Sequence, residues 1–116
     1  MSEPMANVVL DESIMDIWPT LYTDGAIGIY IATAGTEGED MWGVASINLG
    51  DYPGLVDPAC EIALSHNLCA NDRKLIAEAL GIEPTRYVSY GFVKEMPVLR
   101  FEDLSPWADL REKLER

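Results

Sequence analysis

The chain has 116 residues, is 48% apolar and carries a formal net charge of −12 at pH 7. This length and composition fit one domain over 1–116 with a real hydrophobic core. No apolar run approaches the roughly 18 residues of a membrane span, and the N-terminus is acidic where a signal peptide is basic. We therefore expect a cytoplasmic protein without a membrane partner.

Two strands joined by a tight turn are predicted in the N-terminal third. The apolar runs 13–22 and 26–34 flank Thr23-Asp24-Gly25, and Asp-Gly between apolar runs is a strong hairpin signal. In the second run every other residue from 27 to 31 is isoleucine, so one face of that strand is expected in the core.

Pro19 makes the first of these strands ambiguous. Proline cannot donate a hydrogen bond to a sheet, so we expect an edge strand, or one that is broken at this residue. A helix over Asp11 to Trp18, capped by Asp11, is the alternative for the same segment.

Short strands alternate with loops in the middle of the chain. Residues 35–40 hold two glycines and three acids and are expected to form an exposed hairpin loop. Residues 42–49 resume a strand pattern, with Ile47 and Leu49 on one face. A loop is predicted at 50–54, and 61–65 is either a short strand or an irregular stretch before the next helix.

Helical signals occur twice in the C-terminal half. Residues 71–81 combine an Asn71 cap, an apolar stripe and a terminal glycine. Ser105 and Pro106 open a second helix that runs toward the C-terminus.

Residues 86–93 and 98–101, which lie between the two helices, are expected to be strands joined across 94–97. The predicted fold class is α+β: an antiparallel sheet of about five strands with one packed helix and a C-terminal helix.

The charge is segregated along this fold. All eight Lys and Arg residues follow position 72, whereas twelve of the twenty acids lie at or before it. The first 72 residues therefore carry −12, and in the remainder eight bases balance eight acids. Such a field repels nucleic acid and anionic membranes and attracts basic proteins.

Twelve carboxylates equal the charge of about 20 Å of duplex DNA, which carries one charge per roughly 1.7 Å. If most of them share one face, their density resembles that of DNA. The alternative interpretation of the same charge is an ordinary acidic soluble protein, in which the charge only keeps the protein dispersed in solution.

A contact set for a basic partner follows from this charge. Loops on either side of one strand are expected to present five acids together: Glu37, Glu39, Asp40, Asp51 and Asp57. The hypothesis extends the set with Asp11, Glu12 and Asp16. Most aromatic residues should be core or rim, whereas Tyr30 and Tyr52 are the expected exposed anchors.

Metal and nucleophile chemistry has little support. Cys60, His66 and Cys69 are the only cysteine and histidine residues, and a structural zinc site needs four ligands, usually in two close pairs. We expect no stoichiometric zinc and two reduced, buried thiols. A Cys-His catalytic pair would depend on His66 and Cys69 alone. No catalytic residue, metal or cofactor is predicted.

Nucleotide and nucleic-acid binding are also disfavoured. The glycines form no GxGxxG or GxxxxGK[ST] pattern, and no basic stripe exists that could follow a phosphate backbone.

Five segments carry a family resemblance: ASINLGDYPGL (45–55), EIALSHNL (61–68), ALGI (79–82), VSYGFV (88–93) and PVLRF (97–101). Over about residues 20–101 the chain resembles a bacterial family of small proteins carried on plasmids and other mobile elements. The resemblance implies an accessory gene of mobile DNA, some of which are anti-CRISPR or anti-restriction proteins acting in the host bacterial cell. It supplies no catalytic residues.

These observations predict a non-enzymatic inhibitor of a host defence system. It would act as an acidic, DNA-mimic-like decoy that blocks a basic nucleic-acid-binding surface of a CRISPR effector or restriction component. Two alternatives remain: an acidic immunity or adaptor protein that neutralises a basic toxin or nuclease, and a small structural protein that pairs edge strands in a homodimer.

Overall fold

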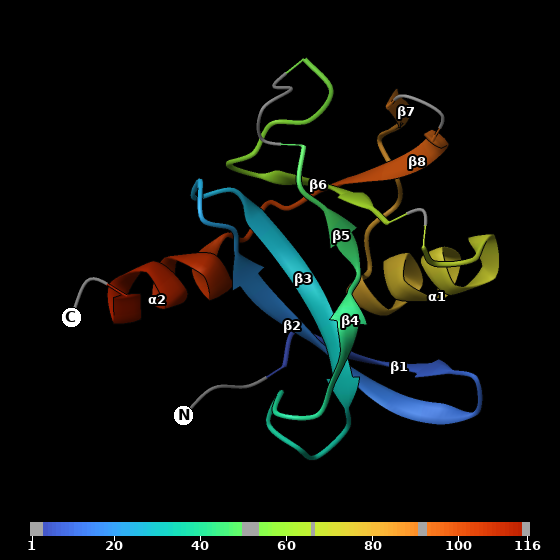
Figure 1. Ribbon diagram of the computed structural model, residues 1–116, viewed down its shortest axis with the longest axis vertical. Coiled ribbons are helices and arrows are strands. Elements are labelled where there is room, and N and C mark those ends of the chain that lie inside the picture. Colours follow the sequence, from blue (N-terminus) through green and yellow to red (C-terminus); the bar gives the residue numbers. More distant parts are fainter. Residues whose placement is uncertain (1–3, 50–53, 66, 91–92, 115–116) are drawn as a thin grey trace.

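The computed structural model describes residues 4–49, 54–65, 67–90 and 93–114 (Figure 1). These residues form two antiparallel sheets of four strands each and two helices. The α+β class predicted from the sequence is therefore confirmed. The strands, however, divide between two sheets instead of forming a single sheet of about five.

The first sheet has the strand order β1-β2-β3-β4. Its strands are β1 (Ala6–Leu10), β2 (Ser13–Leu21), β3 (Ile27–Thr33) and β4 (Met41–Val44). β2 is extended throughout, so the helical alternative for Asp11 to Trp18 is wrong. The sequence pattern did not predict β1.

Pro19 lies within an unbroken β2, which is an internal strand of the sheet. The expectation of an edge strand is therefore wrong, but its physical reason survives. β1 begins at Ala6, which pairs with Ile17 of β2, and the preceding Met5 N–H donates to the Ile17 carbonyl at 2.7 Å. Opposite Pro19 stands Ile29, whose backbone bonds run toward the other neighbour, to Ala45 and Ser46. The nitrogen of Pro19 thus faces a position that β1 does not reach, and no ladder bond is lost.

The second sheet has the strand order β5-β6-β8-β7. Its strands are β5 (Ser46–Ile47), β6 (Glu61–Leu64), β7 (Arg86–Tyr90) and β8 (Val93–Arg100). The connection predicted at 94–97 is wrong, because these residues belong to β8. Residues 91–92, between β7 and β8, lie outside the described residues.

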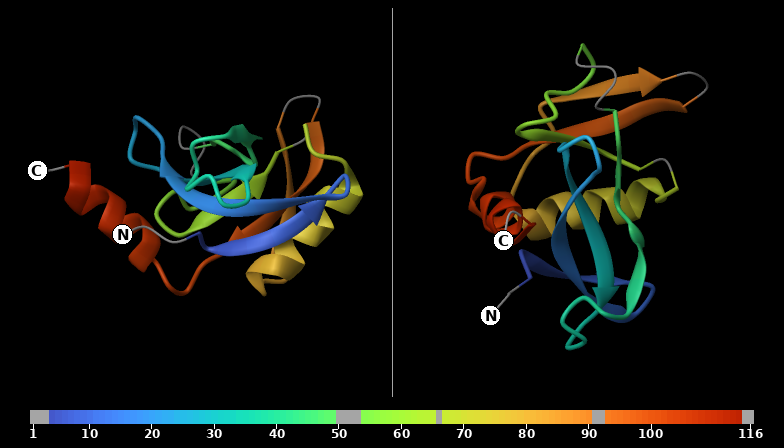
Figure 2. Two further views of the ribbon diagram at one scale, coloured as in Figure 1. Left: turned by 90° about the horizontal axis from the view of Figure 1, so that it is seen from below. Right: turned by 60° about the vertical axis from the view of Figure 1, so that its left-hand side comes forward.

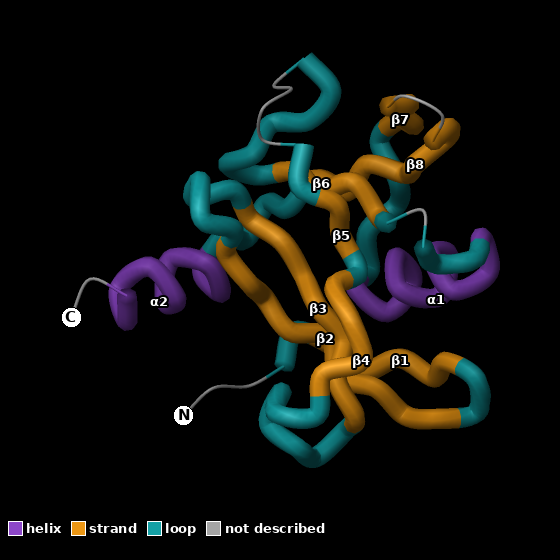
Figure 3. The backbone as a smooth tube through the Cα atoms, viewed as in Figure 1, coloured by secondary structure: helices purple, strands orange, loops and turns teal. Residues whose placement is uncertain are grey.

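The strand predicted over 42–49 is shared between the sheets, as β4 and then β5 (Figure 3). The chain passes from one to the other at Ala45, which is fully buried. Its N–H donates to the carbonyl of Ile29 at 2.9 Å, and its carbonyl accepts the N–H of Ser65 at 2.7 Å. One residue thus joins β3 of the first sheet to the end of β6 in the second.

The helices are α1 (Ala70–Leu80) and α2 (Ser105–Leu114). Gly81 ends α1 in the left-handed conformation, as predicted, but the N-cap is Cys69 and not Asn71. At the start of α2 the Asp103 carboxylate, and not the Ser105 side chain, accepts the first N–H at 3.0 Å. The Ser105 hydroxyl donates to the same carboxylate at 2.7 Å. The hydrogen bonds from the Ser105 hydroxyl and backbone N–H hold the pKa of Asp103 below its ordinary value.

The main core lies between the inner face of the first sheet, the second sheet and the helices. The predicted isoleucine face of β3 is buried in it, together with Ile76 of α1. Trp107 of α2 is also fully buried; its indole N–H donates to the Gly28 carbonyl at 2.9 Å, and its ring packs edge-on against Phe101. Helix α2 is thereby fixed to the first sheet.

A second apolar cluster covers the outer face of the second sheet. Leu49, Leu55 and Val56 pack there against side chains of β6, β7 and β8. An ion pair closes the cluster, because Arg86 donates two hydrogen bonds to the buried Glu61, at 2.7 and 2.9 Å, and a third to the Leu55 carbonyl at 2.6 Å. Hydrogen bonding from Arg86 lowers the pKa of Glu61.

Candidate functional site

The face of the first sheet turned away from the core, here called the open face, exposes large apolar side chains. The strand register places Val9, Ile14, Met41 and Val44 on this side, opposite the buried positions. Together with Trp42 they account for five of the six exposed large hydrophobic residues in the described chain, with exposed fractions of 45–59%. A concentration of this kind is typical of an interaction surface.

Trp42 occupies a β-bulge. Gly43 pairs with Ile31 and Met41 pairs with Ala32, so Trp42 has no partner of its own on β3. The extra residue changes the register and keeps both Met41 and Val44 on the open face. Bulges commonly redirect side chains at functional sites.

The acidic loop, residues 34–40, folds over the middle of the open face, on the side opposite to α1 (Figure 2). Its start is fixed by hydrogen bonds from Ala34 to the Ile14 carbonyl and from Gly35 to the Asp16 carboxylate. Gly38 has a φ of +82°, and a Cβ there would collide with the Tyr30 hydroxyl. The loop is therefore packed closely against the sheet.

Five exposed acids, here called the acidic end, lie in two connections at one end of the first sheet. Asp11 and Glu12 form the β1–β2 turn, where both residues have positive φ, and the others belong to the acidic loop. Both connections lie at the same end of the antiparallel sheet. The acidic end comprises Asp11, Glu12, Glu37, Glu39 and Asp40. None of the five pairs with a cation in the described ranges, although Asp40 accepts a hydrogen bond from Thr33 at 2.6 Å.

The remaining predicted acids do not join this group. Asp16 is only 5% exposed and bonds to Asn7 and the Gly35 N–H beneath the acidic loop, so its role as an exposed contact is wrong. Asp57 is exposed at the opposite end of the sheet, where the neighbouring Pro58 carbonyl accepts the Ile27 N–H at 3.1 Å. Loops on either side of one strand therefore do not present Asp57 with Glu37 and Glu39. Asp51 lies outside the described residues.

The aromatic anchors also differ from expectation. Tyr30 is half-buried, its hydroxyl donates to the Gly38 carbonyl at 3.5 Å, and burial raises its pKa. Tyr52 lies outside the described residues. Of the three tryptophans, Trp18 and Trp107 are buried and Trp42 is 51% exposed. Strand alternation alone could not identify Trp42, since its exposure depends on the bulge.

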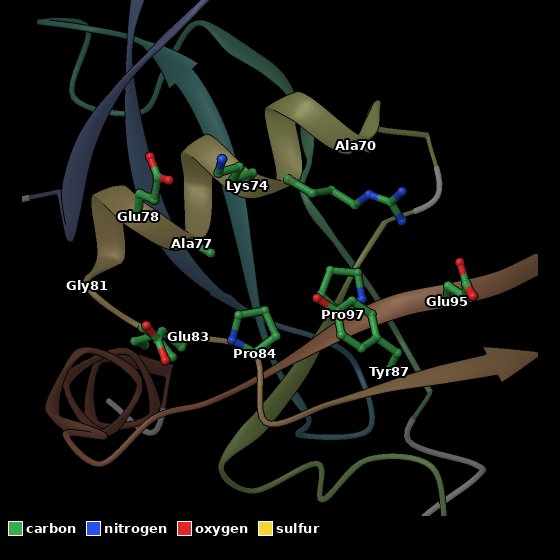
Figure 4. A pocket seen from close by; sticks show the side chains of 12 residues that line it. Ala70, Lys74, Ala77, Glu78, Gly81, Glu83, Pro84, Tyr87, Glu95 and Pro97 are labelled. Carbon is green, nitrogen blue, oxygen red and sulfur yellow. The ribbon is translucent and has the colours of Figure 1, made fainter.

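A groove of about 770 Å³ lies between α1 and the β7–β8 pair (Figure 4). Arg73 and Lys74 of α1 line it, as do the exposed Tyr87 and three glutamates, Glu78, Glu83 and Glu95. Its described lining holds charges of both signs and an aromatic ring, but no Ser, Thr, Cys or His. This lining does not select one ligand chemistry.

The cysteines are both free thiols. Cys69 is exposed, contrary to the expectation of two buried thiols, and Cys60 is half-buried, with a pKa raised mainly by burial and by its hydrogen bond to Asp57. His66 lies outside the described residues. Within the described ranges no group of three or more His, Cys, Asp or Glu side chains could hold a metal ion.

No protein-family model, curated protein or solved structure matches the chain. Among the described helices, neither is long and apolar enough to cross a membrane.

Proposed function

We propose that this chain is a non-enzymatic inhibitor that occupies a basic, nucleic-acid-binding surface of a partner protein. The observation that carries the proposal is the first sheet, which has five exposed apolar side chains, four on the open face and Trp42 on the edge strand β4, and five exposed carboxylates in the connections at one end. Apolar side chains at the centre of an interface supply most of the affinity. Charges at its rim increase the association rate and make the interface specific for partners of opposite charge.

The size of the acidic end limits what it imitates. Five carboxylates equal the charge of about 8 Å of duplex DNA. The decoy therefore competes for a few phosphate positions and not for a long stretch of duplex. Binding must rely on the apolar side chains for the remainder of the affinity, which distinguishes this protein from an extended DNA mimic.

The biological class follows from the sequence resemblance to proteins of mobile elements. On that basis the partner is a CRISPR effector or a restriction component in the host cell. In this proposal the exposed surface of the first sheet is the site through which the chain inhibits a host defence protein.

The test is competition with DNA. A CRISPR effector complex or a restriction enzyme is mixed with labelled duplex DNA, and the chain is titrated in at low and moderate salt. Two variants with the same change in net charge are compared: Glu37→Lys/Glu39→Lys/Asp40→Lys at the acidic end, and Glu78→Lys/Glu83→Lys/Glu102→Lys elsewhere.

We expect the wild-type chain to displace DNA and the acidic-end variant to need about ten-fold more protein at low salt, because long-range charge attraction is lost. The matched variant should stay within about two-fold of wild type. Equal losses in both variants would mean that net charge alone acts. A wild-type chain that displaces no DNA from either class of partner would reject the proposed function.

A further inference from the structure

We infer that β4 is a docking edge, to which a basic, extended segment of the partner adds as a further strand. The inference rests on the proposed function and specifies how the partner is held. Strand addition of this kind gains affinity from backbone hydrogen bonds and specificity from alternate side chains.

The backbone of β4 is available along one edge. β4 is the last strand in the order of the first sheet, with β3 on its other side. In the described chain no turn, loop or cap hydrogen bond involves the backbone of Met41–Val44. The Ala45 N–H points to β3, toward Ile29. Because successive residues of a strand alternate, the N–H and C=O of Val44 point to the free edge.

The side chains of β4 do not protect this edge. Proteins commonly protect exposed edges with lysine, with proline, with an inward-facing charge, with a β-bulge or by keeping the edge strand very short. Met41–Val44 is short and bulged but holds no lysine, proline or charge, and Met41, Trp42 and Val44 are 53%, 51% and 45% exposed. A Cβ added at Gly43 would meet no atom within 4 Å. The strand is short and bulged, so pairing supplies few hydrogen bonds, and the exposed side chains must supply the remaining contacts.

Charge selects the occupant. Glu37, Glu39 and Asp40 precede β4 directly, and all eight Lys and Arg residues of the chain follow position 72. An incoming strand with alternating basic and apolar residues can place its cations beside these acids. A second copy of this chain would instead bring like charges together, because each copy carries −12. The edge therefore fits a basic partner segment better than self-association.

A peptide tests the inference directly. The probe is an eight-residue peptide of alternating lysine and valine, and its control is the same peptide N-methylated at every backbone amide, which keeps the charge but removes the backbone donors on both edges. Trp42 reports binding by fluorescence, since Trp18 and Trp107 are 5% and 0% exposed; Trp42→Phe verifies the assignment of the signal.

The protein variants are Val44→Pro, which removes the outward N–H, and Val44→Thr, which keeps it in a residue that favours strands. We expect Val44→Pro to weaken peptide binding about ten-fold and Val44→Thr to change it by less than about three-fold. The N-methylated peptide should bind wild-type protein about ten-fold more weakly, a comparison that does not depend on how Val44→Pro folds.

The outcomes separate the inference from the function. Equal binding of both peptides, with binding still lost in Glu37→Lys/Glu39→Lys/Asp40→Lys, would reject strand addition and leave the decoy intact. If the wild-type chain displaces no DNA from the partner, and if Glu37→Lys/Glu39→Lys/Asp40→Lys leaves peptide binding unchanged, both the proposed function and the inference are rejected. A concentration-dependent dimer that Val44→Pro dissolves would assign the edge to a second copy and overturn the inference.

Discussion

The two sheets of the described chain are both four-stranded and antiparallel, yet their outer faces differ. The second sheet is covered by residues on either side of 50–53, which build an apolar cluster closed by the Arg86–Glu61 ion pair. The first sheet is covered only in its middle, by the acidic loop, and exposes five large apolar side chains. The exposed apolar surface is therefore concentrated on one sheet, which is what a binding surface requires.

Charge follows the same division. The acids of the first sheet's acidic end have no described cation beside them, whereas the second sheet pairs its buried acid with an arginine. Both sheets contribute to the core, but the outer face of the second is packed and its buried acid paired, whereas the outer face of the first leaves apolar and acidic side chains exposed. Three predictions test this contrast, in order of decreasing effect.

The largest effect is expected from a pair of tryptophans. Trp107→Ala should lower the free energy of unfolding by about 3–5 kcal/mol, because it removes a fully buried ring and a hydrogen bond to Gly28. Trp42→Ala should cost less than about 1 kcal/mol, because the ring is half exposed. Urea unfolding measures both. Similar losses would mean that Trp42 belongs to the core and that the face is not free.

The second prediction concerns the Arg86–Glu61 ion pair of the second sheet. Arg86→Met leaves Glu61 buried without its cation and should cost about 2 kcal/mol at pH 7, below the usual loss for a buried pair because the Arg86 side chain is 42% exposed. Arg100→Met removes an exposed arginine opposite Glu61 in the register, which acts on Glu61 only by its charge and without a hydrogen bond, and should cost under about 1 kcal/mol, less than Arg86→Met.

The effect of Arg86→Met should depend on pH. The folded-state pKa of Glu61 is lowered, so its stabilisation is fully present above the unfolded value of about 4.3 and is lost as pH falls through the folded value. The difference between wild type and Arg86→Met should therefore stay constant from pH 7 to about 5 and shrink below about 4. A difference that persists unchanged at pH 2 would assign the loss to packing.

The smallest effect concerns repulsion at the acidic end. Glu37→Gln/Glu39→Gln should raise the melting temperature by about 1–3 °C at low salt, and the gain should vanish near 1 M salt, where charges are screened within about 3 Å. Glu83→Gln/Glu102→Gln, in the balanced part of the chain, should show no gain. An equal rise in both variants would mean that repulsion is spread over the whole molecule.

Local patterns predicted most elements of the fold. The Asp-Gly turn, the isoleucine face of β3 and Gly81 at the end of α1 were all correctly identified, because each depends on a few neighbouring residues. β1 was not predicted because Val8, Val9 and Leu10 form a short apolar run without polar alternation, although Val9 faces outward in the structure. Pro97 suggested a connection, yet it lies buried within β8 opposite Tyr87.

The candidate site was less predictable, since it depends on contacts distant in sequence. Asp16 has the alternation of an outward residue, but the acidic loop folds over it. Glu37, Glu39 and Asp40 were correctly predicted as exposed, whereas their grouping with Asp57 failed because β4 and β5 separate the two loops. The exposed position of Trp42 required knowledge of the bulge on β3 and β4.

The bonds of Ala45 have a consequence for how the protein loses its structure. Its N–H belongs to the ladder with β3, and its carbonyl holds the end of β6. Separating either sheet from the other breaks backbone hydrogen bonds in a fully buried position, so neither sheet has an independent route to the unfolded state. The amides of Ala45 and Ser65 should exchange with solvent only through global opening, with one common free energy of opening. A partner bound at β4 would slow the exchange of both.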